Sequence, residues 1–381
     1  MSTASTESVA TSRRPLPAML IAGVIGLVFG FVVLQIVNAG IALLWETVPE
    51  TWETTPIWYV FAVLVIAAVL VYVIRRYVGD TGHSPLGGIA VSSLTPGEYV
   101  AAILAILASL LGGIVLGPEV ALVASGSVVG GLVAKGMKFT DPKNEKKVVG
   151  FGALGAILAL FVGPLLAGSM SMEGAPTSIE VDQLGWAIVV AVIATVAVTL
   201  ARLVAFLIAR AAGPGPHLGI LVGSALVIGV TAILMHYGTG QPVLYVVTSG
   251  EELIADLPTL TSVSTVVAII IFKSIAYAVS MGAGFRGGPF FPAMFIGAAS
   301  GLLIALVLPD GPSVEAAIII GVVASVIATA PMKWPIAILL GIVIGFAMGS
   351  WALVPAALLA AIVARAIPRW GDRFALSAHE G

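Results

Sequence analysis

A single acidic residue, Glu119, stands inside an apolar run of small residues, and its surroundings recur later in the chain. Gly117-Pro118 opens this run, and Gly288-Pro289 opens a second run 171 positions further on (288 − 117), with glycines at the same two later places. A Gly-Pro pair ahead of an apolar, small-residue run indicates a helix start. The first turn of a helix offers unpaired backbone N–H groups and the positive end of the helix dipole, which together bind anions. The two segments therefore point to anion binding by backbone groups, with one carboxylate beside them.

The candidate anion-binding residues are the first turns of these two expected helices. Proline suits a first-turn position because its missing N–H is not needed there, and glycine lets the backbone approach a ligand closely. Phe290 and Phe291 either line a pore and exclude water or belong to the core. The candidates are Gly117, Pro118, Val120, Ala121, Gly288, Pro289, Phe290 and Phe291.

The composition indicates an integral membrane protein. The chain has 381 residues, 59% of them hydrophobic and 9% charged, whereas about 25% are charged in a soluble domain. Successive apolar runs fit membrane spans, and the last is long enough for two passes. The runs are Ala18–Leu44, Ile57–Ile74, Tyr99–Leu116, Val148–Met170, Gly185–Ala209, Leu218–Met235, Val263–Met281, Ala316–Ile327 and Ile336–Ala366.

Several function classes are disfavoured. A net charge of −2, without a basic patch interleaved with aromatics, argues against nucleic acid as a partner. The chain has no cysteine and four histidines far apart in sequence, so we expect no metal site and no cofactor. The stretch Gly282–Gly287 matches a dinucleotide-binding pattern literally, but it follows a membrane span rather than a strand. No serine–histidine or histidine–acid pair shares a plausible helix face, which argues against an enzyme.

The basic residues predict the orientation in the membrane. By the positive-inside rule, the segments that carry them face the cytoplasm, and the acidic loops between them face outward. We therefore expect a multi-pass protein of the cell membrane, in contact with lipid, with both termini cytoplasmic. The basic residues concerned are Arg13, Arg14, Arg75, Arg76, Lys135, Lys138, Lys143, Lys146, Lys147, Arg365, Arg369 and Arg373.

The two Gly-Pro segments are predicted to run in opposite directions. The segment from Glu119 leads into the lysine-rich loop, whereas its counterpart leads into residues 308–312, which carry no lysine or arginine. An inverted repeat of this kind brings both helix starts together near the midplane. The expected division is a tail (1–15), a first repeat (16–170), an external loop (171–184), a second, inverted repeat (185–370) and a tail (371–381). The alternative is that these small residues only let membrane helices pack closely.

Three charged residues need an explanation in this scheme. An ionisable group inside a membrane span is costly, so Glu119 is interpreted as a gate whose carboxylate competes with an anion for the helix-start N–H groups. The alternative is a helix cap at an aqueous surface. Lys273 lies within an apolar span and requires a partner or a watery cavity, and Arg286 either draws anions inward or anchors a helix end.

These residues resemble the CLC family of chloride channels and proton-coupled chloride antiporters. Gly288, Phe290 and Pro292 match the family's Gly-X-Phe-X-Pro signature, and Lys273 stands where many members carry lysine. The stretch from Leu116 to Ala121 is similar to the Gly-Arg/Lys-Glu-Gly-Pro signature, which would make Glu119 the external gating glutamate, although Pro118 replaces the basic residue. Ala330-Pro331 is similar to the family's Ala-Pro before a late helix. The resemblance covers about residues 16–370 and implies a homodimer with one pore per subunit, built from tilted and broken helices.

The chain also departs from the family pattern. The Gly-Ser-Gly-Ile-Pro element, which supplies a serine hydroxyl to the inner anion, is echoed only at residues 81–85, which makes Ser84 the candidate. Phe374 is the nearest counterpart of the inner tyrosine, and no acid stands at Val162 or Gly163, where the antiporters' internal glutamate should fall.

That missing glutamate favours a passive chloride channel, or a weakly coupled carrier, over a stoichiometric proton-coupled antiporter. The antiporter remains an alternative, since Glu173 or water could relay protons. A cation-coupled organic-solute carrier, which also uses broken helices, is a weaker alternative because only Glu119 would stand at the midplane. The fold expected is an all-α, CLC-like inverted-repeat bundle in the membrane.

Overall fold

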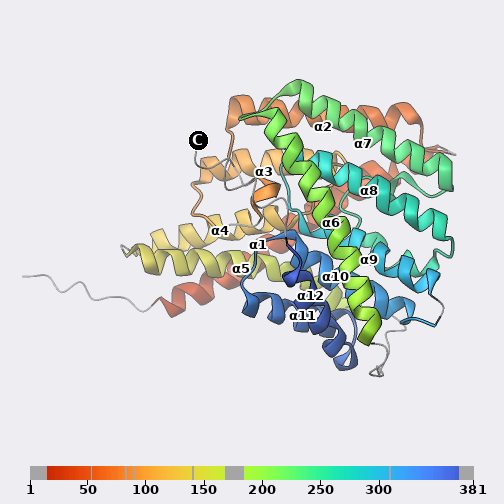
Figure 1. The fold of residues 1–381 in the computed structure, drawn as a ribbon. Coiled ribbons are helices and arrows are strands. Elements are labelled where there is room, and N and C mark those ends of the chain that lie inside the picture. The colour runs from red at the N-terminus through yellow and green to blue at the C-terminus, as the bar shows by residue number, and fades with distance from the viewer. Residues whose placement is uncertain are drawn as a thin grey trace, which may run out of the picture.

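Helices account for most of the described chain (Figure 1). The computed structural model describes residues 15–52, 54–81, 84–88, 91–139, 141–167, 184–308 and 310–368, and side chains are described for all of these except 161–167. No strand occurs in these ranges, and their one β-type pairing is an isolated antiparallel bridge between Gly117 and Gly288. The expected all-α, CLC-like fold is confirmed.

The first half contains five helices, and α1 packs against both α4 and α5. Its helix bounds follow the predicted spans, with α1 and α2 each continuing into a five-residue π-helical turn, Leu43–Thr47 and Ile74–Val78. The helices are α1 (Leu16–Ala42), α2 (Ile57–Val73), α3 (Pro96–Leu111), α4 (Glu119–Gly136) and α5 (Pro142–Ala167).

The second half contains seven helices, with α9 packed against α6, α8 and α10. The predicted run Ile336–Ala366 forms two helices, as expected from its length. The helices are α6 (Leu184–Ala212), α7 (Leu218–Thr239), α8 (Val263–Gly282), α9 (Phe290–Val307), α10 (Val314–Thr329), α11 (Trp334–Met348) and α12 (Val354–Ala366). In Figure 1, α2 and α7 lie side by side along one edge of the molecule, and α11 and α12 lie at the opposite edge.

The repeated glycines inside α4 and α9 allow close helix packing in each half. A Cβ atom added at Gly126 would collide with the backbone of Gly152 on α5, and one added at Gly297 would collide with the backbone of Gly321 on α10. Glycine at these places therefore lets two helix backbones touch, as small residues do in membrane helices. The packing interpretation is right for these later glycines, while the glycines at the helix starts do something different.

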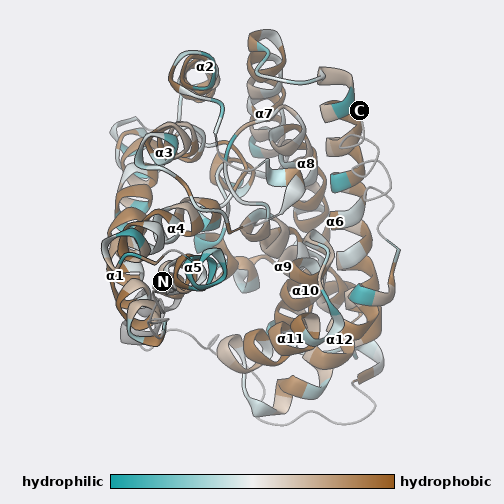
Figure 2. Cartoon of the chain, turned by 90° about the vertical axis from the view of Figure 1, so that its left-hand side faces the viewer, coloured by the Kyte–Doolittle hydropathy of each residue, from teal (hydrophilic) through white to brown (hydrophobic). Residues whose placement is uncertain are grey.

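The outer surface of the bundle is apolar. Seven of the described helices are long and apolar enough to cross a membrane. Large apolar side chains such as Leu20, Ile25 and Leu234 are exposed, and in Figure 2 hydrophobic residues dominate the long helices. An all-round apolar helix surface suits lipid rather than water. The chain is a multi-pass membrane protein.

Candidate functional site

Two helix starts that are far apart in sequence meet through a short backbone pairing. The N–H of Gly117 donates to the carbonyl of Gly288 at 2.7 Å, and the N–H of Gly288 donates to the carbonyl of Gly117, also at 2.7 Å. Gly117 lies two residues before α4 and Gly288 two residues before α9. The pairing therefore holds the positive ends of two helices together.

These two starts have no side-chain cap, as is also true of α1, α2, α7, α11 and α12, whereas three other helices have one. Thr95, Ser262 and Ser313 accept N–H bonds at the starts of α3, α8 and α10. In contrast, α4 and α9 follow Pro118 and Pro289, with no side-chain cap on either. Their first N–H groups are left for another acceptor, because a helix cannot satisfy them itself.

Glu119 supplies that acceptor across the gap between the two halves. Its Oε1 accepts a hydrogen bond of 2.6 Å from the backbone N–H of Phe290, the first residue of α9. The Glu119 residue is 3% exposed, and its Oε2 is buried without a hydrogen-bond partner among the described residues. The carboxylate of the first residue of α4 therefore occupies the start of α9. This is the position that a small anion bound at α9 would take.

The two bridge glycines make room for this carboxylate. A Cβ atom added at Gly288 would overlap the Glu119 carboxyl group, and one added at Gly117 would overlap Glu119 Oε2. Any larger residue at either position would push the carboxylate away from Phe290.

A buried tyrosine, which the sequence analysis did not single out, fixes the second helix start. The Tyr277 hydroxyl on α8 donates to the Pro289 carbonyl at 2.7 Å, and the residue is fully buried. The same hydroxyl lies within hydrogen-bonding reach of Arg202 on α6 and Thr329 at the end of α10. A tyrosine within an apolar run could have pointed to this contact, because a buried hydroxyl needs a hydrogen-bond partner.

Lys273 has the partners that its place in a span requires. Its Nζ donates to the carbonyls of Val247 and Thr248, at 3.1 and 3.0 Å. The ammonium group also lies 5.0 Å from the centre of the Phe295 ring, as in a cation–π contact. Lys273 thus holds the turn that precedes Glu251.

Arg286 anchors the loop in front of α9. Its Nη2 lies 2.5 Å from Asp80, whose carboxylate also takes an ion pair of 2.7 Å from Arg75. Arg75 in turn donates to the Gly284 carbonyl at 2.8 Å. Burial raises the pKa of Asp80, but the hydrogen bonds from Arg75 and Arg286 outweigh it and hold that pKa below its usual value. Of the two alternatives for Arg286, these contacts favour the anchor.

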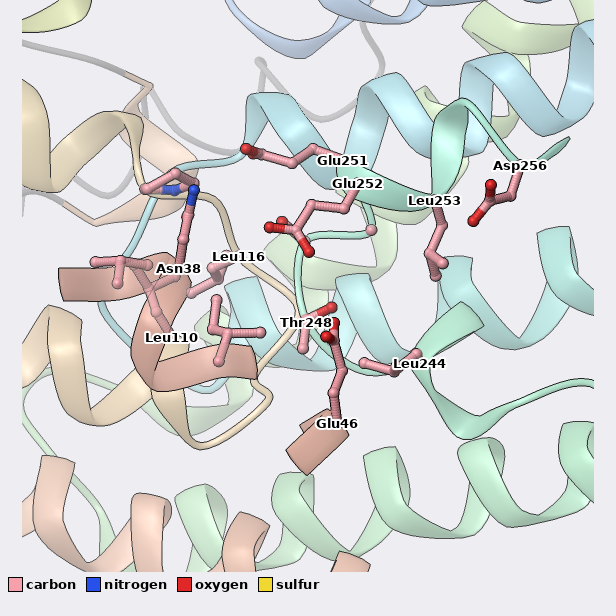
Figure 3. A pocket seen from close by; sticks show the side chains of 15 residues that line it. Asn38, Glu46, Leu110, Leu116, Leu244, Thr248, Glu251, Glu252, Leu253 and Asp256 are labelled. Atoms are coloured by element: carbon pink, nitrogen blue, oxygen red, sulfur yellow. The ribbon is translucent and has the colours of Figure 1, made fainter. Parts of the chain in front are cut away.

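A cavity of about 160 Å³ lies next to the start of α4 (Figure 3). Leu116 and Pro118, the neighbours of Gly117, form part of one wall, and the turn carrying Thr248 and Glu251 forms another. It gives water-sized molecules a place beside the Glu119 region.

Known proteins resemble this chain in sequence and in fold. The family model described as "Voltage gated chloride channel" matches residues 197–369. The curated protein "Putative ion-transport protein YfeO" of Escherichia coli (strain 55989 / EAEC) is 27% identical, over 78% of this chain and 80% of that protein. The crystal structure of a slow cyanobacterial Cl⁻/H⁺ antiporter superposes with a TM-score of 0.74 at 16% identity, covering 96% of this chain and 98% of the other.

The matched family model covers the second half of the chain, and the fold of the whole chain is CLC-like. A second CLC structure, of a CLC-type fluoride/proton antiporter, has a TM-score of 0.67 at 16% identity and covers 93% of this chain and 96% of the other. Both of these solved structures are described as antiporters of an anion and protons.

The remaining CLC-like positions are distributed as follows. Val120 and Ala121 are buried in the first turn of α4, while Phe290 and Phe291 are half-buried in the first turn of α9. Ser84 is exposed at the start of a short 3₁₀ turn, Pro85–Gly87. The residue after that turn, Gly88, approaches Ala330, since an added Cβ would lie 3.5 Å from the Ala330 Cβ.

Phe374 and Glu173 lie outside the described residues. Val162 and Gly163 lie on α5, in the stretch whose side chains are not described.

Proposed function

We propose that this CLC-like protein is a permease for chloride-class anions, that the anion passes the paired starts of α4 and α9, and that Glu119 is its gate. The observation that carries the proposal is the 2.6 Å hydrogen bond from the Phe290 N–H to Glu119 Oε1. Backbone N–H groups bind an anion strongly enough to replace its water yet weakly enough to release it. The Glu119 carboxylate must leave that position before an anion can enter.

The proposed anion-contacting groups are the first turns at Gly117, Pro118, Val120 and Ala121, and at Gly288, Pro289, Phe290 and Phe291. Ser84 is proposed as the inner hydroxyl, because the 3₁₀ turn that it begins packs against α6 and α8. The matched descriptions of a voltage-gated chloride channel and of a Cl⁻/H⁺ antiporter both support a chloride-class substrate.

Chloride efflux from proteoliposomes tests the gate. We expect Glu119→Gln and Glu119→Ala to change the rate of chloride efflux and to remove most of its dependence on pH. Glu50→Gln is the matched control, because Glu50 is an exposed acid in a loop distant in sequence from both helix starts. Efflux from both Glu119 variants that follows the wild type at every pH would refute the gate.

Passive conduction is the transport mode that we propose, and proton-coupled exchange is the alternative. The absence of an acid at positions 162 and 163 in the sequence supports the channel. The two solved structures described as proton antiporters support the alternative. Simultaneous recording of chloride and pH in liposomes separates the two, since only an antiporter drives protons uphill with a chloride gradient.

The arrangement in the membrane is also a proposal. We place the lysine-rich end of α4 and both termini in the cytoplasm, and residues 16–170 and 185–370 form the two inverted repeats of a homodimer subunit in the cell membrane. Hydrophilic residues gather at the ends of α4 and α5 in Figure 2, which supports a cytoplasmic lysine loop. Labelling of a cysteine introduced at Lys143 with an impermeant reagent, from each side of the membrane, tests the orientation.

A further inference from the structure

The cavity beside the start of α4 is lined by acidic residues, which is unexpected for the mouth of an anion pathway. Figure 3 shows Glu251 and Glu252 extending from one turn, while Glu46 enters from the opposite wall and Asp256 stands further along. Four ionised carboxylates would repel an approaching anion. The cavity therefore suits an anion only when part of this charge is neutralised.

Glu251 lines this cavity and is close enough to Glu119 for the two charges to interact. Its Oε2 is buried without a hydrogen-bond partner among the described residues, and the same is true of Glu119 Oε2. Glu119 Oε2 lies against Gly117, whose neighbours Leu116 and Pro118 line the cavity. Each of these two acids thus has a buried carboxylate oxygen without a partner among the described residues, and the residues on either side of Gly117 line the same cavity as Glu251.

The turn that carries Glu251 is held firmly. The Thr248 N–H donates to the Gly113 carbonyl at 3.0 Å, just before the Gly117 bridge. Lys273 donates to the carbonyls of Val247 and Thr248 from the other side. The backbone of this turn is therefore fixed, so Glu251 does not reach bulk water by movement of the whole turn.

The charged groups that face Glu251 are mostly of its own sign. They are Glu119 on α4, Glu252 and Asp256 on its own segment, Glu46 at the end of α1, and Lys273 on α8 beneath the turn. The Lys273 ammonium group is already committed to two carbonyls. Burial, followed by the charges of Glu119 and Glu252, raises the pKa of Glu251 to about 8. A proton is thus the partner that suits this carboxylate near neutral pH.

We propose that Glu251 is a second proton-binding group of this permease, placed at the outer mouth between external water and Glu119. This inference rests on the proposed function of Glu119. When Glu251 is ionised, its charge keeps anions out of the cavity. When it is protonated, the mouth accepts an anion and a proton is available next to Glu119.

The proton balance of this step is simple. A carboxylate oxygen of Glu251 takes a proton from hydronium of the external solution, which leaves water, and that proton then passes to the carboxylate of Glu119. Glu251 is left as a carboxylate and is protonated again from outside. The anion then enters the cavity and takes the place of neutral Glu119 at the Phe290 N–H.

The test is chloride efflux from proteoliposomes with the internal pH fixed and the external pH lowered from about 9 to about 6. For the wild type we expect the rate to rise as the pH falls, by up to about tenfold per pH unit above the midpoint, because one proton is bound. Glu251→Gln cannot pass a proton to Glu119, so its rate should respond to external pH much less than the wild-type rate does. Glu50→Gln is the control and should follow the wild type.

Each outcome decides one of the two proposals. If Glu251→Gln superimposes on the wild type while Glu119→Gln alters the profile, the role of Glu251 is refuted and the gate stands. If Glu119→Gln also leaves the profile unchanged, the proposed function itself fails. A wild type whose efflux does not depend on external pH refutes the Glu251 proposal even where a variant does not fold. Glu251→Asp keeps the carboxylate and should keep an external-pH response.

Discussion

Glu119 at the start of α4 is bonded to the backbone N–H of Phe290 at the start of α9, 2.6 Å away. A side chain from one half of the chain thereby caps the helix of the other half. The same N–H would hold an anion, because the first turn of a helix is an anion-binding position. While the Glu119 carboxylate holds the Phe290 N–H, an anion cannot bind there.

Gly288→Ala should displace the Glu119 carboxylate. An alanine Cβ would overlap the carboxyl group at a place where the backbone is also bonded to Gly117. We expect a stability loss of about 1–3 kcal/mol from overpacking, together with altered chloride efflux. The matched control is Gly219→Ala, since nothing lies within 4 Å of an added Cβ there. Thermal unfolding in detergent measures the first effect; equal melting temperatures for the two variants would contradict the close contact.

Tyr277→Phe should loosen the start of α9. The change removes the hydrogen bond to the Pro289 carbonyl and the hydroxyl's contacts with Arg202 and Thr329, so we expect a loss of about 1–3 kcal/mol. Chloride efflux should also fall, since the Phe290 N–H is no longer held in place. Tyr237→Phe is the control, because Tyr237 is 70% exposed on α7. The prediction fails if both variants melt and transport like the wild type.

Asp80→Asn should lower stability at neutral pH and matter less in acid. The ion pairs with Arg75 and Arg286 hold the pKa of Asp80 below its usual value. A depressed folded-state pKa stabilises the fold above the unfolded-state pKa, and this stability is lost as the pH falls through the folded-state value. The melting-temperature gap to the wild type should therefore narrow from about pH 7 to about pH 3. The control Asp310→Asn, at an exposed acid, should melt at the wild-type temperature. A melting-temperature difference for Asp80→Asn that does not change with pH would contradict the ion-pair account.

The sequence was sufficient to predict the spans and the pairing of the two Gly-Pro segments. Long apolar runs predict membrane helices directly, because a chain can cross a bilayer in few other structures. The convergence of Gly117 and Gly288 followed from the opposite charge of the loops beyond each segment.

The partners of the buried polar groups could not be predicted in the same way. Tyr277 meets Pro289 only after α8 and α9 have packed, and Lys273 finds the carbonyls of a turn 25 residues earlier. Glu251 is one acid among several in a loop, and only its burial beside the cavity sets it apart. Such contacts depend on tertiary structure, which no local pattern encodes.

Chloride binding to the purified protein, titrated calorimetrically at several pH values, tests the central claim most directly. If the Glu119 carboxylate competes with the anion for the Phe290 N–H, wild-type affinity should weaken as the pH rises and more of the carboxylate is ionised. Glu119→Ala should bind chloride more tightly, with little dependence on pH. Equal affinity in the two proteins at every pH would contradict the account.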